Sequence, residues 1–211
     1  MSTHAARMPP YELHCHLDGS VRPGTVADLA RKQGIALDRP VEDLVVASAH
    51  CGSLTTFLPH IDPTSPPLQV LRTPTPDTLT RIRTRTRTAR ELVEDWKTDG
   101  DVHGEVRFTP QLHVRHGMTP DEAVQAVADG LAQDRVTTGV RPGLLLCCMR
   151  HQSPDESVAV AEPALRHRGV VAGLDLAGHE TCRPPSLIGR LRPHPPCRPA
   201  LPRTRRRCRG S

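Results

Sequence analysis

Large aromatic side chains are scarce in this chain of 211 residues, which has one Trp, one Tyr and two Phe. A hydrophobic core must therefore rest on Leu, Val and Ala, with few large side chains to anchor it. The length is sufficient for one sizeable domain, and the hydrophobic share of 36% is modest. We expect a single domain of marginal stability.

Several signals of membrane, secreted and zinc-thiolate proteins are also missing. No apolar run approaches the roughly 20 residues that a membrane span needs, and residues 1–10 lack the apolar stretch of a signal peptide. The seven cysteines form no CxxC pair, which argues against a zinc-thiolate knot. The sequence therefore predicts a cytoplasmic protein with reduced thiols and no membrane partner.

Acidic residues are absent from residues 183–211, which hold nine Arg and seven Pro. Without this tail, 19 basic residues remain of 28, against 23 acidic ones, so the body has a net charge of −4. Such a tail cannot bury enough apolar area to offset its ordering entropy, and we predict that it is disordered. A coding frame that shifts after Cys182 is the favoured explanation, and a nucleic-acid-binding arm is the alternative.

Strand and helix patterns alternate between these ends. We expect a disordered leader at residues 1–10 and helix starts capped by Thr119 and Ser153, the second helix faltering at Pro163. Strands are predicted over residues 11–16, 102–108, 144–149 and 170–177, and further helices over residues 23–33 and 41–46. This alternation is typical of parallel βα units.

Two segments between the first and second strands allow more than one interpretation. Residues 54–70 carry apolar side chains at helical spacing, which is compatible with local core packing. From Arg83 to Thr88, Arg and Thr alternate without an apolar helical stripe. Low-complexity or corrupted sequence is favoured there over a nucleic-acid patch, and the helical pattern is expected to begin only at Ala89.

The first predicted strand carries the strongest chemical signal. His14 and His16 are two residues apart, so their side chains lie on one face of a strand and can bind one metal ion together. Asp18 follows just past the strand end, where a loop can present it to a substrate. The alternative is a pair of half-exposed histidines on an edge strand. Five other histidines have no metal spacing and receive no metal role: His50, His60, His103, His113 and His116.

Four segments, in order, resemble those of the adenosine deaminase family. They are YELHCHLDGS at residues 11–20, GEVRFTP at 104–110, LCCMRHQ at 146–152 and GLDLAGHE at 173–180. The resemblance implies an α/β fold of the parallel (β/α)8 TIM-barrel type, of which residues 11–182 would supply about the first four βα units. By resemblance, residues 54–70 correspond to the family's lid over the purine, with local core packing an equal alternative, and His14 and His16 correspond to an inherited zinc pair.

The family's chemistry implies roles for four residues. By resemblance, His14 and His16 are Zn²⁺ ligands, and His16, Asp18 and Gly178 contact the substrate, which is adenosine or a related purine nucleoside. The implied reaction is hydrolysis to inosine and ammonia by a zinc-activated hydroxide. The family's later HAGE segment, a further histidine and an aspartate pair have no counterpart here, so no residue is assigned as catalytic.

The resemblance therefore predicts a truncated, inactive form of a zinc hydrolase. Two alternatives remain. The chain could be a half-barrel that assembles with itself or with a separate partner. It could instead be a basic nucleic-acid-binding protein that uses residues 81–90 and 183–211.

Overall fold

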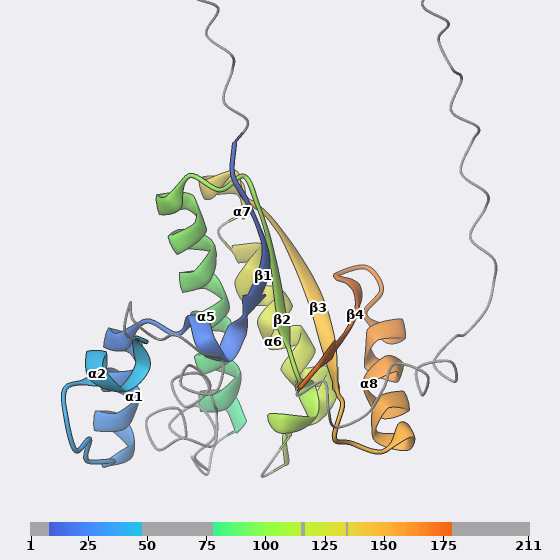
Figure 1. The fold of residues 1–211 in the computed structure, drawn as a ribbon, viewed down its shortest axis with the longest axis horizontal. Helices are drawn as coiled ribbons and strands as arrows, with labels where there is room; N and C mark the ends of the chain where they lie inside the picture. Colours follow the sequence, from blue (N-terminus) through green and yellow to red (C-terminus); the bar gives the residue numbers. More distant parts are fainter. Residues whose placement is uncertain (1–8, 48–77, 115–116, 134, 179–211) are drawn as a thin grey trace, which may run out of the picture.

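The computed structural model describes residues 9–47, 78–114, 117–133 and 135–178. Its four strands form one parallel sheet in chain order, so that the first and last strands are the two edges (Figure 1). The strands are β1 (Tyr11–His16), β2 (His103–Phe108), β3 (Arg141–Met149) and β4 (Val171–Ala177). The predicted tail, the predicted lid segment and most of the predicted leader lie outside the described residues.

Three helices, α5, α6 and α8, pack on one face of the sheet and run back along it between strands (Figure 1). The helices are α1 (Pro23–Gln33), α2 (Val41–Val45), α5 (Thr78–Asp99), α6 (Pro120–Gln133), α7 (Arg135–Thr138) and α8 (Pro154–Arg166), with short 3-10 turns η1 (Leu17–Ser20) and η2 (Pro110–Leu112). The predicted bounds of β1 and α1 are confirmed, and Pro163 does not interrupt α8. No helix within the described ranges is long and apolar enough to cross a bilayer.

The main core lies between this helix layer and the sheet. Val106, Leu144 and Leu146 from the strands are at most 1% exposed, and Trp96 of α5 packs with them. Gly104 on β2 is required by this packing, because a Cβ there would lie 2.5 Å from the Trp96 ring. Trp96 therefore anchors the core where the sheet meets α5.

Helix α5 begins eleven residues earlier than predicted, because the Arg/Thr run is helical from Thr78. Thr84, Thr86 and Thr88 each donate a side-chain hydrogen bond to the carbonyl four residues back, which accommodates these β-branched residues in a helix. Arg81 and Arg85, four residues apart, are only 6% and 4% exposed. Helix α5 therefore has a buried face, but at the start of the helix the buried side chains are two arginines instead of apolar residues.

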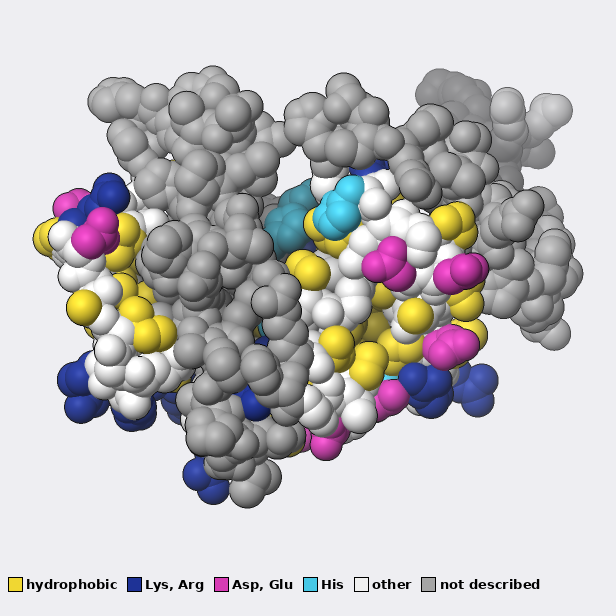
Figure 2. Space-filling view, turned by 90° about the horizontal axis from the view of Figure 1, so that it is seen from below, with side chains coloured by type: hydrophobic (Ala, Val, Ile, Leu, Met, Phe, Trp, Pro, Cys, Tyr) yellow, Lys and Arg dark blue, Asp and Glu magenta, His cyan; other side chains and the backbone are white. Residues whose placement is uncertain are grey.

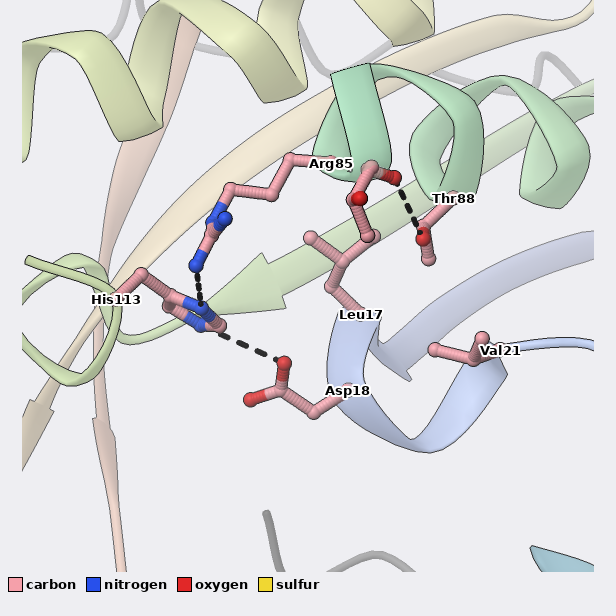
Figure 3. A pocket seen from close by; sticks show the side chains of 7 residues that line it. Leu17, Asp18, Val21, Arg85, Thr88 and His113 are labelled. Carbon is pink, nitrogen blue, oxygen red and sulfur yellow. Dashed lines mark hydrogen bonds and ion pairs between the residues drawn. The ribbon is translucent and has the colours of Figure 1, made fainter. Parts of the chain in front are cut away.

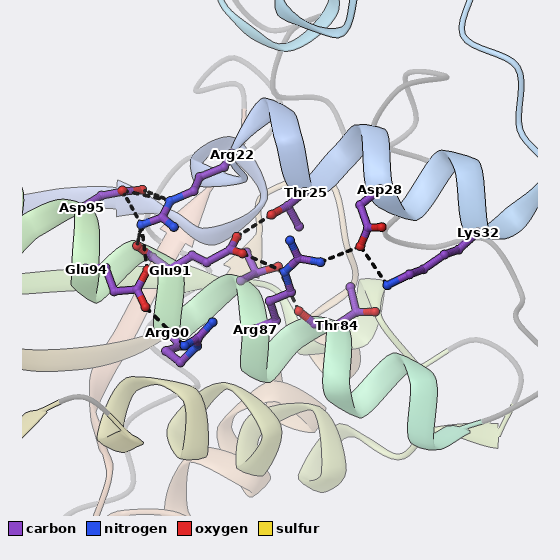
Figure 4. Close-up of polar contacts among 11 residues, drawn as sticks. Arg22, Thr25, Asp28, Lys32, Thr84, Arg87, Arg90, Glu91, Glu94 and Asp95 are labelled. Carbon is purple, nitrogen blue, oxygen red and sulfur yellow. Dashed lines mark hydrogen bonds and ion pairs between the residues drawn. The ribbon is translucent and has the colours of Figure 1, made fainter.

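Polar contacts attach α1 to α5 (Figure 4). Arg22 donates to Asp95 at 2.7 Å, and the Thr25 hydroxyl donates to the Glu91 carboxylate at 2.6 Å. Arg87 pairs with Glu91 from the same helix at 2.7 Å. Arg81 and Arg85 are thus buried and Arg87 is paired with acidic side chains, whereas Arg83 is exposed, which weakens the interpretation of residues 81–90 as a nucleic-acid patch.

Candidate functional site

The two histidines of β1 lie side by side, as the alternation of a strand predicts. The ring centroids of His14 and His16 are 5.4 Å apart. Cys15, between them, packs instead against the helix-side core. The pair therefore occupies the concave face of the sheet, opposite the helices, near the carboxyl end of β1.

The surroundings of His16 favour a neutral imidazole. Burial, the neighbouring His14 and the Arg107 guanidinium together lower the pKa of His16. A neutral ring keeps the nitrogen lone pair that a metal ligand needs. Figure 2, which looks toward the carboxyl ends of the strands, shows histidine side chains reaching the surface in the middle of that view.

Asp18 lies in η1, directly after β1, and faces a buried histidine (Figure 3). Its Oδ1 is 3.4 Å from Nε2 of His113, and Nδ1 of His113 is 3.0 Å from Nη2 of Arg85. Arginine can only donate, so Nδ1 must accept and the ring proton must be on Nε2, the nitrogen that lies nearer to Asp18. Arg85 of α5 thus binds the His113 ring, and the ring lies beside the Asp18 carboxylate.

These residues line a small pocket next to the end of β1. Its wall consists of Leu17, Asp18, Val21, Thr84, Arg85, Thr88 and His113. His113 lacks metal spacing and Arg85 belongs to the Arg/Thr run, so neither is among the site residues that the sequence predicts. The signal that could have identified Arg85 is the four- and three-residue spacing that places Arg81, Arg85 and Thr88 on one helical face.

Gly178 directly follows β4 and has a φ of 106°. A side chain would be strained in this left-handed conformation, which is sufficient reason for glycine at this position. Because β4 is parallel to β1, Gly178 and the histidine pair lie at the same end of the sheet, the carboxyl end, at its two opposite outer strands. The substrate contact predicted for Gly178 remains a prediction.

The concave face fits two ligands of a zinc ion. Imidazole nitrogens are ordinary zinc ligands, and the pair is close enough to share one ion. Burial and the Asp175 carboxylate raise the pKa of Cys147 to about 12, so its thiol is protonated at neutral pH. Among the described residues, no group of three or more His, Cys, Asp or Glu side chains could hold a metal ion.

Comparison with known proteins identifies the family. A match to the family described as adenosine deaminase covers residues 9–194. This chain belongs to the adenosine deaminase family. The match reaches beyond residue 180, the end of the last of the four motifs.

Curated bacterial members of the family align along most of this chain. An adenosine deaminase of Clostridium perfringens is 36% identical over 179 residues, covering 82% of this chain and 50% of the relative. One of Enterococcus faecalis is 38% identical over 184 residues, covering 85% and 51%. The chain thus spans about half the length of these curated relatives.

Solved structures of amidohydrolases share the fold. An amidohydrolase of Burkholderia ambifaria with bound Zn has a TM-score of 0.69 at 29% identity, and covers 86% of this chain and 47% of its own. An adenine deaminase of Arthrobacter aurescens has a TM-score of 0.69 at 27% identity, covering 87% and 53%. Arabidopsis ADAL complexed with IMP has a TM-score of 0.68 at 28% identity, covering 86% and 53%. The fold is therefore α/β of the parallel TIM-barrel type, with a four-stranded part of the barrel described here.

Proposed function

We propose that this chain carries the first half of an aminohydrolase site that converts adenosine and water to inosine and ammonia. The observation that carries the proposal is the adjacent His14 and His16 pair on the concave face, in a chain of the adenosine deaminase family. Barrel enzymes place their chemistry at the carboxyl ends of the strands, which is where this pair lies. The curated relatives named above support adenosine as the substrate.

In this proposal His14 and His16 would hold Zn²⁺, each through one ring nitrogen. A bound zinc ion lowers the pKa of a coordinated water to about 7 and so supplies hydroxide at neutral pH. The chain's own contribution is to keep His16 neutral through burial and the nearby positive charge. The free thiols of Cys15, Cys147 and Cys148 agree with a cytoplasmic location.

The substrate contacts in this proposal are His16, Asp18 and Gly178. Asp18 accepts from a ribose hydroxyl, because its carboxylate is oriented by His113 and offers further lone pairs. Gly178 lets the backbone approach the planar base, since it has no side chain. The substrate in this proposal is thus a purine nucleoside.

We further propose that the described residues do not turn over adenosine alone. Two imidazoles are fewer than the three protein ligands of an ordinary catalytic zinc site. General acid–base groups each contribute about 10² to 10⁴ in rate, and no described residue is assigned that role. Turnover would need further groups from outside the described residues.

The test is a chimaera in which residues 9–182 replace the aligned segment of the Clostridium perfringens relative. We expect the chimaera with zinc to convert adenosine to inosine, followed by ultraviolet absorbance, and the same chimaera with His14→Ala to lose that activity. The chain by itself should show no turnover. A folded, zinc-loaded chimaera without activity, or one whose activity survives His14→Ala, would overturn the proposal.

A second arrangement, assembly with another chain, is favoured by the two sheet edges. Leu13 on β1 is 53% exposed and Leu174 on β4 is 42% exposed, as are apolar residues of α8 such as Leu165 at 57%. Exposed apolar edge strands invite pairing with further strands. Light scattering during size exclusion measures the oligomeric state of the chain: a compact dimer supports self-assembly, and a monomer excludes self-assembly.

A further inference from the structure

We propose that Arg107 and Asp175 are positioning residues for the histidine pair, because they hold a bulge in β1 that directs His14 and His16 to the concave face. The importance of the pair rests on the function proposed above. The inference itself concerns only the geometry of β1 and its neighbours.

The pairing of β1 with β2 contains one irregularity. Glu12 lies opposite Gly104, and Cys15 lies opposite Val106. Two residues of β1, Leu13 and His14, therefore face a single residue of β2. This two-against-one arrangement is a β-bulge, a feature that often re-aims side chains near active sites.

The bulge decides which side chains of β1 enter the core. If the register at Glu12 continued without a bulge, His14 would lie opposite Val106 and His16 opposite Phe108. Val106 and Phe108 are 0% and 2% exposed in the helix-side core, where imidazoles would be poorly solvated. The extra residue instead places Cys15 opposite Val106 and His16 opposite Arg107.

Arg107 binds the bulge itself. From β2 its Nη2 donates to the carbonyl of Leu13, a bulge residue, at 2.7 Å. Its Nη1 donates to Oδ2 of Asp175 on β4, also at 2.7 Å. One guanidinium therefore joins three strands across the concave face, and Arg107 as a whole is only 7% exposed.

The rigid fork of arginine explains why this anchor is specific. Its donors point in fixed directions, so satisfying both Asp175 and the Leu13 carbonyl defines where that carbonyl must lie. A glutamine at the same position has no charge and a single donor nitrogen, so it loses the ion pair with Asp175 and the two-nitrogen fork that reaches both acceptors. A lysine retains the charge without the planar fork and should restore the anchor only in part.

The experiment compares the full chain with Arg107→Gln, Arg107→Lys and a control, Arg22→Gln, which breaks an ion pair between α1 and α5. Alkylation of Cys15 and Cys148 is followed peptide by peptide in a mass spectrometer. A β1 register that slips exposes Cys15, whereas Cys148 lies on β3 in the same core and reports on unfolding. Nuclear Overhauser contacts between the His14 and His16 rings are measured in parallel.

We expect Cys15 in Arg107→Gln to react about tenfold faster or more, because a charged hydrogen bond that opposes local opening is lost. Cys148 should keep its rate, and the ring contact should weaken. The Cys15 rate in Arg107→Lys should lie between those of the unmodified chain and Arg107→Gln. The rate in Arg22→Gln should match that of the unmodified chain. Equal acceleration of Cys15 and Cys148, or no change at Cys15 and the rings, would overturn the inference.

These readouts are independent of zinc and of adenosine. An inactive chimaera would contradict the proposed function while leaving the bulge anchor intact. A normal Cys15 rate in Arg107→Gln would remove the anchor while leaving the proposed function standing.

Discussion

The two faces of the sheet differ sharply although the same strands build both. On the helix-covered face, Val106, Leu144 and Leu146 are at most 1% exposed and entirely apolar. On the concave face, His16, Arg107 and Asp175 are polar and interact with one another electrostatically. Because side chains alternate along a strand, one face can provide the stability of the fold while the other carries its chemistry.

The largest effect should come from emptying the helix-covered face. Leu146→Ala should lower the free energy of unfolding by about 2–5 kcal/mol, since it leaves a cavity in a filled core. Leu145→Ala, one residue earlier and partly exposed on the other face, is the matched control and should cost clearly less. Urea unfolding followed by circular dichroism measures both, and equal losses would mean that the two faces do not differ as described.

The helix layer contains a polar exception to this contrast. Arg85→Gln should lower the free energy of unfolding by about 1–3 kcal/mol, because it removes the donor to Nδ1 of buried His113. Arg83→Gln changes an exposed arginine of the same run and should stay within about 0.5 kcal/mol of the unmodified chain. Indistinguishable urea midpoints for the two variants would contradict the buried role of Arg85.

Sequence patterns located most elements well, for reasons that the structure makes clear. The predicted strand at residues 11–16 and the caps at Thr119 and Ser153 depend on local signals, and all are present. The start of α5 was missed because burial there depends on partners distant in sequence, such as His113. The bulge in β1 was equally invisible, since it is set by Arg107 and Asp175 on other strands.

A smaller effect is expected at the start of α8, which covers the apolar face. Ser153→Ala should cost about 1 kcal/mol, because the Ser153 hydroxyl accepts from the Glu156 backbone N–H in a capping box. Thr98→Ala removes an exposed hydroxyl that bonds only within α5 and serves as the control. If both variants unfold at the same urea concentration, the cap does not stabilise α8.

The smallest effect should depend on pH. The hydrogen bond from Arg166, with that from His167, lowers the pKa of Asp121 and links the start of α6 to the end of α8. The stabilising contribution of the Asp121 carboxylate is present above its unfolded pKa of about 4. It is lost as the pH falls through the lower pKa that Asp121 has in the folded chain. The difference in stability between the unmodified chain and Asp121→Asn should therefore shrink between pH 7 and pH 3 in urea titrations. A difference that grows on acidification would contradict this sign.

The decisive measurement is a titration of the chain with Zn²⁺ while the histidine ring signals are followed by nuclear magnetic resonance. The ring signals of His14 and His16 should shift together, and His14→Ala should weaken the response of His16. The His151 and His167 rings serve as internal references and should stay in place. No shift at His14 and His16, or a His16 response unaffected by His14→Ala, would show that the pair does not bind zinc as a unit.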